Sequence, residues 1–444
     1  MGKTVMNEKY SAYPEYKDSG VEWSGLIPES WSVIRHKYIA TFQKGKNPEI
    51  LLDEFEEGAK RYLSMDYLRG NAASLYAYPV KNSYVSKKNQ VLIIWDGSNA
   101  GEFVIAQEGI VSSTMAASEF LASINQRYYW YLCICLEPEM RKYANGMGIP
   151  HVDGNELKNS FLTIPSDREA GKIANFLDHE TAKIDTLIEK QQQLIKLLKE
   201  KRQAVISHAV TKGISSINGA DVPMKKSGVE WLGDVPEHWD VSQVGHCAFV
   251  TKLTGFEYTS LWKIDEGGAV IALRGFNVKE RKLELNDVEN ISLELSTTLV
   301  RSKLAKGDIV FPCTGTIGNA AMIEENDKFH INQNIAKIRF DESVSSRFAI
   351  YWLTSSFIRT LIDKNNTSGM QPVVLIGDIR KLPIPRFKYE EQEAVADYLD
   401  SVADRFNILI SNAISAIYLM RERRTALISA AVTGKIDVRN WSAD

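Results

Sequence analysis

The strongest constraint on this chain is a long internal repeat. Residues 168–214 align without a gap to residues 390–436, at a constant offset of 222. Neither segment contains proline, and in both the apolar residues recur at alternating spacings of three and four, which is typical of a helix with a heptad seam. We therefore predict two long helices, over residues 166–214 and 388–436, each spanning roughly 60 Å.

The predicted seam of each helix is mostly apolar. Gln191 and Lys201 also fall on its spacing, and they either fix the helix register, as buried polar residues do in coiled coils, or face a partner or solvent. The apolar seam residues are Leu177, Ile184, Leu187, Leu194 and Leu198 in the first helix and Leu399, Phe406, Leu409 and Met420 in the second. Because such seams need to be buried, we expect the two helices to pack on each other.

A second repeat opens each half of the chain. Residues 19–31 read SGVEWSGLIPESW and residues 227–239 read SGVEWLGDVPEHW, which match at nine of thirteen positions. Tryptophan buries a large apolar area and is often a packing anchor. We therefore predict two equivalent joints between helix and domain, anchored by Trp23, Trp31, Trp231 and Trp239.

The regions between these repeats hardly resemble each other. Both nevertheless contain an apolar strand, a glycine-containing loop and a second apolar strand, at residues 89–105 and 307–323. Each region is therefore predicted to be an α+β domain. The predicted layout is an N-terminal segment and joint at 1–31, a first domain at 32–160, a central helix at 166–214, a joint at 215–239, a second domain at 240–385, a distal helix at 388–436 and a tail at 437–444.

Chain geometry decides how the helices pair. In a parallel pair, the second domain would have to carry the chain back along roughly 60 Å of helix, but a domain of about 150 residues is only about 40 Å across. Antiparallel pairing removes this difficulty. The predicted fold is therefore α+β, with two globular domains at opposite ends of a pair of antiparallel coiled-coil helices, related by a pseudo-two-fold axis, and with the chain termini meeting in a nearly circular arrangement.

Bulk composition narrows the class of protein. The chain has 44% hydrophobic and 25% charged residues, without an apolar stretch of about 18 residues or a signal-like start, so we expect a cytoplasmic protein. Its net charge of −3 argues against a protein that coats nucleic acid unaided, but it leaves room for local basic grooves. The four cysteines form no Cys-x-x-Cys pair, which indicates free thiols in a reducing compartment.

The sequence carries no familiar catalytic motif. A G-x-x-x-x-G-K-S/T loop, a His-Glu-x-x-His pair and a Gly-x-Ser-x-Gly turn are all missing. The seven histidines are scattered without the spacing of metal ligands. We therefore predict a chain without catalytic residues and without a metal site.

Binding of double-stranded DNA fits this architecture better. Two unlike domains on a rigid spacer can read two unlike half-sites, because major grooves recur on one face of the duplex about every 34 Å. Asn and Gln can pair with adenine and Arg with guanine, while Lys neutralises phosphate. The candidate DNA-binding residues are Lys44, Lys46, Lys87, Lys88, Ser98 and Asn99 in the first domain and Arg274, Asn277, Thr314, Thr316, Asn332, Gln333 and Asn334 in the second. Several of these are also ordinary turn residues.

Two other functions stay open at this point. One is a non-catalytic two-headed coiled-coil scaffold that binds protein or carbohydrate partners, which the aromatic content of 10% and the acidic balance favour. The other is an enzyme whose site is assembled from distant residues. Binding that ignores ionic strength indicates a scaffold, because phosphate contacts make DNA affinity fall steeply with salt.

The two repeats together resemble the DNA specificity subunit, or S subunit, of type I restriction-modification systems. The resemblance covers nearly the whole chain. It is carried by GVEWSGLIPESW and GVEWLGDVPEHW at the joints, by residues 173–214 of the central helix and by ALISAAVTGKIDV at 426–438.

The resemblance implies a function and a set of partners. An S subunit reads a bipartite, asymmetric DNA target with two target recognition domains, and its helical spacer sets the length of the unread gap. It carries no catalytic residues. It recruits two methyltransferase (M) subunits, which bind S-adenosylmethionine, methylate adenine and dock on the spacer and joints, and restriction (R) subunits, which use ATP and magnesium. The resemblance also implies a cytoplasmic protein of a prokaryote.

Overall fold

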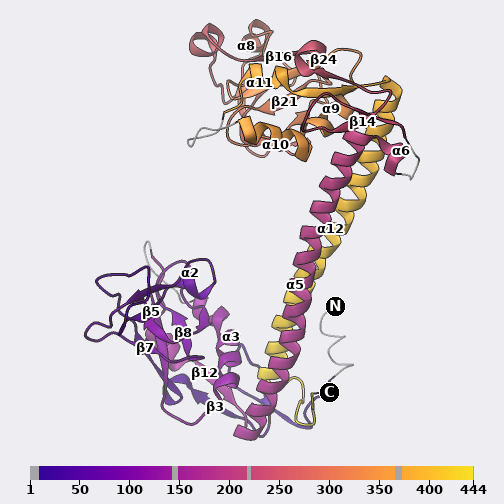
Figure 1. Ribbon diagram of the computed structural model, residues 1–444. Coiled ribbons are helices and arrows are strands. Elements are labelled where there is room, and N and C mark those ends of the chain that lie inside the picture. Colours follow the sequence, from indigo (N-terminus) through magenta and orange to yellow (C-terminus); the bar gives the residue numbers. More distant parts are fainter. Residues whose placement is uncertain (1–9, 143–148, 218–221, 366–372, 444) are drawn as a thin grey trace. The chain divides into compact units, whose positions relative to one another are not determined.

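Two long helices each run from one unit of the chain into the other. A computed structural model describes residues 10–142, 149–217, 222–365 and 373–443 (Figure 1). Unit 1 consists of residues 1–191 and 415–444, and unit 2 consists of residues 192–414. Helix α5 (Asp167–Lys212) begins in unit 1 and ends in unit 2, and α12 (Tyr389–Val432) does the reverse.

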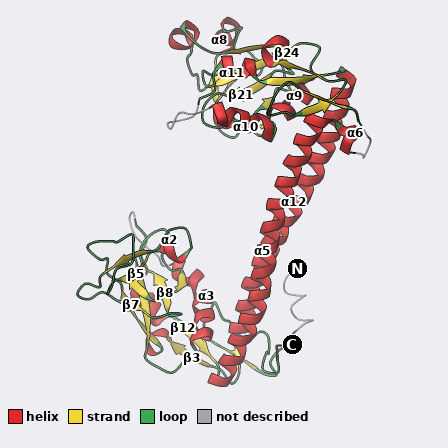
Figure 2. Ribbon diagram, in the orientation of Figure 1, coloured by secondary structure: helices red, strands yellow, loops and turns green. Residues whose placement is uncertain are grey.

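The prediction of two long helices is confirmed. Helix α5 has 46 residues and α12 has 44, and both stand out in Figure 2. Each begins with acidic residues in its first turn, which suit the positive end of the helix dipole. Gly213 and Gly434 follow the last turns with positive φ angles of 77° and 70°, a backbone region that glycine enters without strain.

The two helices pair antiparallel inside each unit. In unit 1, Arg424 near the end of α12 donates from Nε to Asp185 Oδ1 of α5 at 2.9 Å. In unit 2, Arg202 near the end of α5 donates from Nη1 to Asn407 Oδ1 of α12 at 3.1 Å. The beginning of one helix therefore always lies beside the end of the other, as the chain geometry predicts.

The seam of α5 follows a different register from the predicted one. Leu177 and Ile184 are buried and Leu198 is half-buried, but Leu187 and Leu194 are 47% and 43% exposed. The buried or half-buried stripe runs through Leu177, Thr181, Ile184, Ile188, Gln191, Ile195, Leu198 and Arg202. The prediction is wrong for Leu187 and Leu194 because each is followed by an isoleucine, and the isoleucine takes the seam position.

The same shift occurs in α12. Leu399 is buried and Phe406 and Met420 are half-buried, whereas Leu409 is 50% exposed and Ile410 is the half-buried neighbour. The predicted seam is therefore wrong at Leu409 as well. The two polar residues on the predicted seam differ in burial: Gln191 is half-buried, and Lys201 is exposed.

Unit 1 contains a four-stranded antiparallel sheet with the order β4-β11-β8-β9 and a mixed sheet with the order β6-β5-β10-β7, in which β5 and β10 are parallel. Two strand pairs, β1–β2 and β3–β12, complete it. The strands are β1 (Tyr16–Asp18), β2 (Leu26–Pro28), β3 (Ser32–Arg35), β4 (Ala40–Lys44), β5 (Lys60–Leu63), β6 (Leu75–Ala77), β7 (Val85–Ser86), β8 (Val91–Ile94), β9 (Phe103–Ile105), β10 (Gly109–Val111), β11 (Met115–Phe120) and β12 (Phe161–Ile164). The shorter helices are α2 (Met65–Leu68), α3 (Gln126–Lys142) and α4 (Gly154–Asn159).

Unit 2 has sheets with the orders β16-β24-β21-β22 and β20-β17-β23, and in the second sheet β17 and β23 are parallel. The pairs β13–β14, β15–β25 and β18–β19 complete it. The strands are β13 (Met224–Lys226), β14 (Asp234–Pro236), β15 (Asp240–Gln243), β16 (Ala248–Lys252), β17 (Val270–Leu273), β18 (Val278–Lys279), β19 (Lys282–Leu283), β20 (Glu289–Ile291), β21 (Ile309–Pro312), β22 (Ala321–Met322), β23 (Phe329–Ile331), β24 (Ile335–Phe340) and β25 (Pro383–Arg386). The shorter helices are α6 (Ile214–Ile217), α7 (Val244–Cys247), α8 (Leu293–Thr298), α9 (Ser346–Leu353), α10 (Ser356–Asn365) and α11 (Ile376–Lys381).

The two units share one topology although their domain sequences are unlike. The order β4-β11-β8-β9 in unit 1 corresponds to β16-β24-β21-β22 in unit 2, and the parallel pair β5–β10 corresponds to β17–β23. The predicted strand–loop–strand segments are the antiparallel pairs β8–β9 and β21–β22. The predicted α+β class and the internal repeat are confirmed at the level of sheet order.

One tryptophan of each joint is buried against both long helices. Trp31 donates from Nε1 to Glu169 of α5 at 3.1 Å and lies against Gly434, just beyond α12. Trp239 donates to Glu391 of α12 at the same distance. It lies against Gly213, just beyond α5, and a Cβ there would meet the indole at 3.5 Å.

The other tryptophan of each joint lies nearer the surface. Trp23 is half-buried, and its Nε1 has no hydrogen-bond partner among the described residues. Trp231 is 52% exposed, so the prediction that it anchors the joint is wrong. The reason is local: the next residue is the buried one in both joints, since Leu232 is 5% exposed and its counterpart Ser24 is 1% exposed.

Candidate nucleic-acid interface

Several loops of unit 1 lie at one edge of the sheet β4-β11-β8-β9, because two of its strands run in the same direction. Strands β4 and β8 both pair antiparallel with β11, so they run in the same direction and their C-terminal ends lie together. Lys44 ends β4, and Asp96 opens the glycine-containing loop after β8. Lys44 Nζ lies 2.5 Å from Asp96 Oδ2, and His151 Nδ1 lies 3.2 Å from Oδ1 of the same carboxylate.

Backbone hydrogen bonds hold three further segments at this edge. Gly97 N donates to Pro150 O at 2.9 Å, and Trp95 N donates to Thr114 O at 2.7 Å. Ser113 N donates to Asn47 Oδ1 at 2.8 Å. We call this surface edge 1 and define it as residues 44–47, 95–99, 112–114 and 149–151.

Unit 2 builds the same edge from other side chains. Strands β16 and β21 both pair antiparallel with β24, so Lys252 at the end of β16 lies at the edge from which the loop after β21 emerges. Cys313 N donates to Asn334 O at 2.7 Å, which repeats the bond between Trp95 and Thr114. We call this surface edge 2 and define it as residues 252–254, 274–276, 313–318, 332–334 and 373–374.

Arg274 brings a guanidinium to edge 2. It lies between Asp287, at 3.0 Å, and Glu289, at 2.9 Å, and its guanidinium carbon is 4.2 Å from the centroid of the Phe276 ring. Thr316 Oγ1 donates to Gly275 O at 2.8 Å and fixes the loop after β21 beside Arg274. The arginine is therefore held in one orientation by stacking and by two carboxylates.

A buried histidine lies in β23, the strand that leads into residues 332–334 of edge 2. His330, fully buried in β23, lies 2.9 Å from Ser296 Oγ through Nε2 and 3.0 Å from Ser302 Oγ through Nδ1. Burial, and then the positive charges of Lys303 and Lys337, lowers the pKa of His330 to about 4. The ring is therefore neutral at pH 7 and carries one donor and one acceptor for the two serines.

The structure brings together most of the predicted DNA-binding residues. Residues that lie at edge 1 are Lys44, Lys46, Ser98 and Asn99, and residues that lie at edge 2 are Arg274, Thr314, Thr316, Gln333 and Asn334. Lys87 and Lys88 are exposed but precede β8, so they lie at the end of that strand opposite to edge 1. They do not belong with Ser98 and Asn99.

Two of the predicted residues are structural instead. Asn277 is 1% exposed; its Oδ1 accepts from Arg274 N at 2.9 Å, and its Nδ2 donates to two backbone carbonyl oxygens. Asn332 is 8% exposed, and its Oδ1 accepts from Asn334 N at 2.9 Å. Both predictions of a DNA contact are wrong, because the side chains are used to hold their own loops, as asparagine commonly does in turns.

Several edge residues escaped the sequence analysis. Ser113 and Thr114 occupy the place of Gln333 and Asn334, and Lys252 occupies the place of Lys44. A signal for Lys252 existed: it lies 208 residues after Lys44, the offset of the joint repeat. No such signal marked His151, which reaches Asp96 only through the fold. The two segments whose sequence contains Gly-Met, at 143–148 and 366–372, lie outside the described residues.

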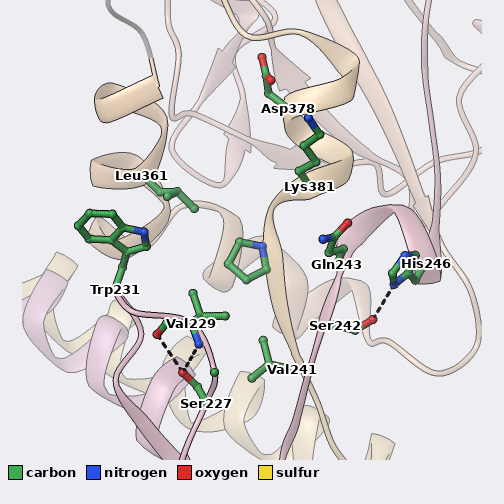
Figure 3. Close-up of a pocket in the computed structure, with 12 residues that line it drawn as sticks. Ser227, Val229, Trp231, Val241, Ser242, Gln243, His246, Leu361, Asp378 and Lys381 are labelled. Carbon is green, nitrogen blue, oxygen red and sulfur yellow. Dashed lines mark hydrogen bonds between the residues drawn. The ribbon is translucent and has the colours of Figure 1, made fainter.

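A cavity of about 540 Å³ lies beside the exposed tryptophan of unit 2. Figure 3 shows Trp231 and Leu361 on one side of it and Gln243 and His246 on the other. The Lys364 Nζ lies 3.6 Å from the centroid of the Trp231 ring. His246, Asp378 and Lys381 also line it, and Ser242 Oγ lies 3.4 Å from His246 Nδ1.

Two further features bear on the function class. Among the described residues, no group of three or more His, Cys, Asp or Glu is arranged to hold a metal ion. Within the same parts of the chain, no helix is long and apolar enough to cross a membrane.

Comparison with known proteins gives consistent similarities. The profile of the type I restriction modification DNA specificity domain matches residues 28–197 and 276–417. The MjaVIII specificity subunit of a type I restriction enzyme from Methanocaldococcus jannaschii is 27% identical over 96% of this chain and 98% of its own length. The EcoBI specificity subunit from Escherichia coli is 20% identical over 94% and 88%. A solved structure from work on assembly and conformational transition of the type I R-M system has a TM-score of 0.62 at 14% identity, and covers 91% of this chain and 98% of that one.

Proposed function

The chain belongs to the type I restriction-modification DNA specificity family and has the DNA specificity role, and from this premise we propose that edges 1 and 2 read the two parts of a split, asymmetric DNA target. One observation carries the proposal. Two units with one sheet topology present a polar loop edge at the same place, but with different side chains. A shared scaffold with unlike edges is what two unlike half-sites require.

The edge residues have the chemistry of DNA recognition. Lys44 and Lys46 at edge 1 can neutralise phosphates, and Asn99 can pair with an adenine edge. At edge 2, Arg274 can contact guanine and Gln333 can contact adenine. Lys44 exchanges its Asp96 partner for phosphate at little cost, because exposed ion pairs contribute only about 0–1 kcal/mol.

The helix pair has a second role as a docking surface for M subunits. In unit 2 the exposed apolar residues Leu194, Leu197, Ile408, Leu409 and Ile414 lie on the two helices, with exposed fractions of 43–61%. In unit 1, Leu187, Tyr418 and Leu419 also lie on the two helices, with exposed fractions of 47–65%. Exposed apolar groups in such number mark a protein-binding surface. Both units offer this surface, which supports binding of two M subunits.

The catalytic steps are proposed to take place on the M and R subunits. S-adenosylmethionine and adenine methylation belong to M subunits in this proposal, and ATP, magnesium and cleavage belong to R subunits. The edges of this chain supply binding and position only. The alternative of a scaffold for protein or carbohydrate partners has no support, because the DNA specificity family accounts for the greater part of the chain.

Methylome sequencing tests the proposal directly. A host expresses this chain with its neighbouring M subunit, and a control host expresses the M subunit alone. We expect a split motif with N6-methyladenine in the first host and none in the second, and the motif gives both half-sites and the gap. A stable complex of the two proteins without a new motif contradicts the proposal.

A further inference from the structure

Each unit holds its domain on a long helix through the same three residue types. Arg127 and Tyr131 are the second and sixth residues of α3, and Arg347 and Tyr351 are the second and sixth residues of α9. Asp178 and Asp400 are each the twelfth residue of their long helix. We call these two groups the unit 1 clamp (Arg127, Tyr131, Asp178) and the unit 2 clamp (Arg347, Tyr351, Asp400).

The contacts of the unit 1 clamp converge on one carboxylate. Arg127 Nε donates to Asp178 Oδ2 at 3.2 Å, and its Nη2 donates to Oδ1. Tyr131 Oη donates to Oδ1 of the same aspartate at 2.7 Å and lies 3.3 Å from Thr181 Oγ1. A forked arginine–carboxylate contact fixes direction as well as distance.

The unit 2 clamp is broader. Arg347 donates to Glu393, Asp397 and Asp400 of α12 at 2.7, 2.7 and 2.6 Å, and Tyr351 Oη donates to Asp400 at 2.5 Å. The three carboxylates spread over about 10 Å of helix. A contact spread along a helix resists rotation of the domain better than a more local one does, so we expect the unit 2 clamp to restrain its domain more than the unit 1 clamp.

The internal repeat shows that packing alone does not explain the clamps. Over the first eight residues of α3 and α9, only the arginine and the tyrosine are the same, although most of the other residues are buried in the domain cores. The two identical residues share one task, because in each unit both donate to the aspartate at the twelfth position of the long helix. The arginine and the tyrosine therefore recur because they attach the domain to the long helix, and not because they fill the domain core.

We propose that the two clamps are positioning elements that fix the direction in which each reading edge leaves the long helices, and so make the choice of one gap length in the split DNA target strict. The proposal rests on the proposed function. Adding one base pair to the gap moves a half-site by about 3.4 Å and turns it by about 34° around the duplex. A protein that accepts only one gap length must therefore prevent each domain from rotating on its long helix by that amount. The clamps oppose this rotation.

The experiment measures methylation at targets whose gap is the wild-type length, one base pair shorter or one longer, with the full chain and its M subunit in the host. We expect the preference for the wild-type gap to fall about tenfold in Arg347→Ala and about threefold in Arg127→Ala, with both half-sites unchanged, because several exposed ion pairs are lost in the first and one in the second. Arg347→Lys keeps the charge without the fork and should fall between wild type and Arg347→Ala.

The matched control is Arg69→Ala. Arg69 forms an exposed ion pair with Glu102 at 2.6 Å inside the unit 1 domain and does not take part in a clamp. It should leave the gap preference at the wild-type value. Tyr351→Phe removes only a hydroxyl, so it reports on the clamp even if Arg347→Ala does not fold.

The outcomes separate the two proposals. A wild-type protein without any split motif removes the proposed function. A wild-type protein with a split motif, together with folded clamp variants that keep its strict gap, overturns the clamp proposal alone. Relaxed half-sites with a strict gap also overturn it, because a positioning residue changes the gap and not the bases read.

Discussion

At the scale of single residues, two buried histidines have lowered pKa values. His330 sits under edge 2 with a serine hydroxyl at each ring nitrogen, and His36 sits in unit 1 with its Nε2 2.7 Å from Tyr129 Oη. Desolvation lowers the pKa of His36 to about 4 as well. Both rings are neutral in the folded chain, because neither core stabilises a protonated imidazole.

We therefore predict that acid destabilises the chain through these rings. The unfolded histidine has a pKa near 6.5 and takes up its proton first as the pH falls, so stability is complete above about pH 6.5 and declines toward pH 4. For His330 the loss between pH 7 and pH 5 should be about 2 kcal/mol. Thermal unfolding at both pH values should show His330→Gln losing part of this difference, because glutamine keeps a donor and an acceptor without titrating there.

The comparison for that prediction is His246→Gln. His246 is exposed in unit 2, so its substitution controls for the change from histidine to glutamine outside a core. An equal pH dependence in wild type and His330→Gln contradicts the prediction. His36 keeps its own contribution in all of these variants.

At the scale of elements, the sequence predicts the long helices well and their register less well. The repeat, its apolar spacing and its lack of proline define α5 and α12 to within a few residues. The doublets Leu187-Ile188 and Leu194-Ile195 offer two apolar neighbours, and spacing alone does not say which one faces the partner helix. An apolar stripe wider than a two-position seam is typical of a helix that also binds on its flank.

Adjacent residues of α5 test this register. Ile188 packs against the unit 1 core, so Ile188→Ala should lower the free energy of unfolding by about 1–2 kcal/mol, less than for a fully buried isoleucine. Leu187→Ala should change it by less than about 0.5 kcal/mol, because the side chain is 47% exposed. Chemical denaturation measures both. If Leu187 docks an M subunit, only Leu187→Ala should weaken the complex while the chain itself stays stable.

The candidate site was predictable in part for a related reason. Ser98 and Thr314 stand in loops between paired apolar strands, and that pattern is visible in the sequence. Burial of Asn277 and Asn332 is not visible, since an asparagine that reads a base and one that holds a turn look alike in a sequence. His151 and Asp96 meet through a pairing of segments 55 residues apart, which no local pattern encodes.

At the scale of the whole molecule, the two joints are made in the same way although only one is covalently continuous. In unit 2, α5 runs through Gly213 toward β13 and β14. In unit 1 the corresponding link is made by contacts between the two ends of the chain: Tyr16 Oη donates to Gly434 O at 3.0 Å, and Asp437 N donates to Ser11 O at 2.7 Å. Each domain is thus held on the helices by equivalent joints and clamps, from which we predict that it can be exchanged.

Exchange of the first domain for that of a relative with another target should change one half of the DNA motif only. The exchanged segment should be residues 32–164 and not 32–160, because β3 pairs with β12 along its whole length and the two strands must move together. The donor should carry arginine and tyrosine at the second and sixth positions of its α3, so that the clamp to Asp178 is kept. Methylome sequencing should then show a new half-site, with the other half-site and the gap unchanged, because each wrong base pair costs about 1–3 kcal/mol at the half-site that reads it and nothing at the other.

The reciprocal exchange of residues 240–386, which keeps β15 with β25, should change the opposite half. A change in both half-sites after either exchange contradicts independent reading, since it means that one unit alters what the other recognises.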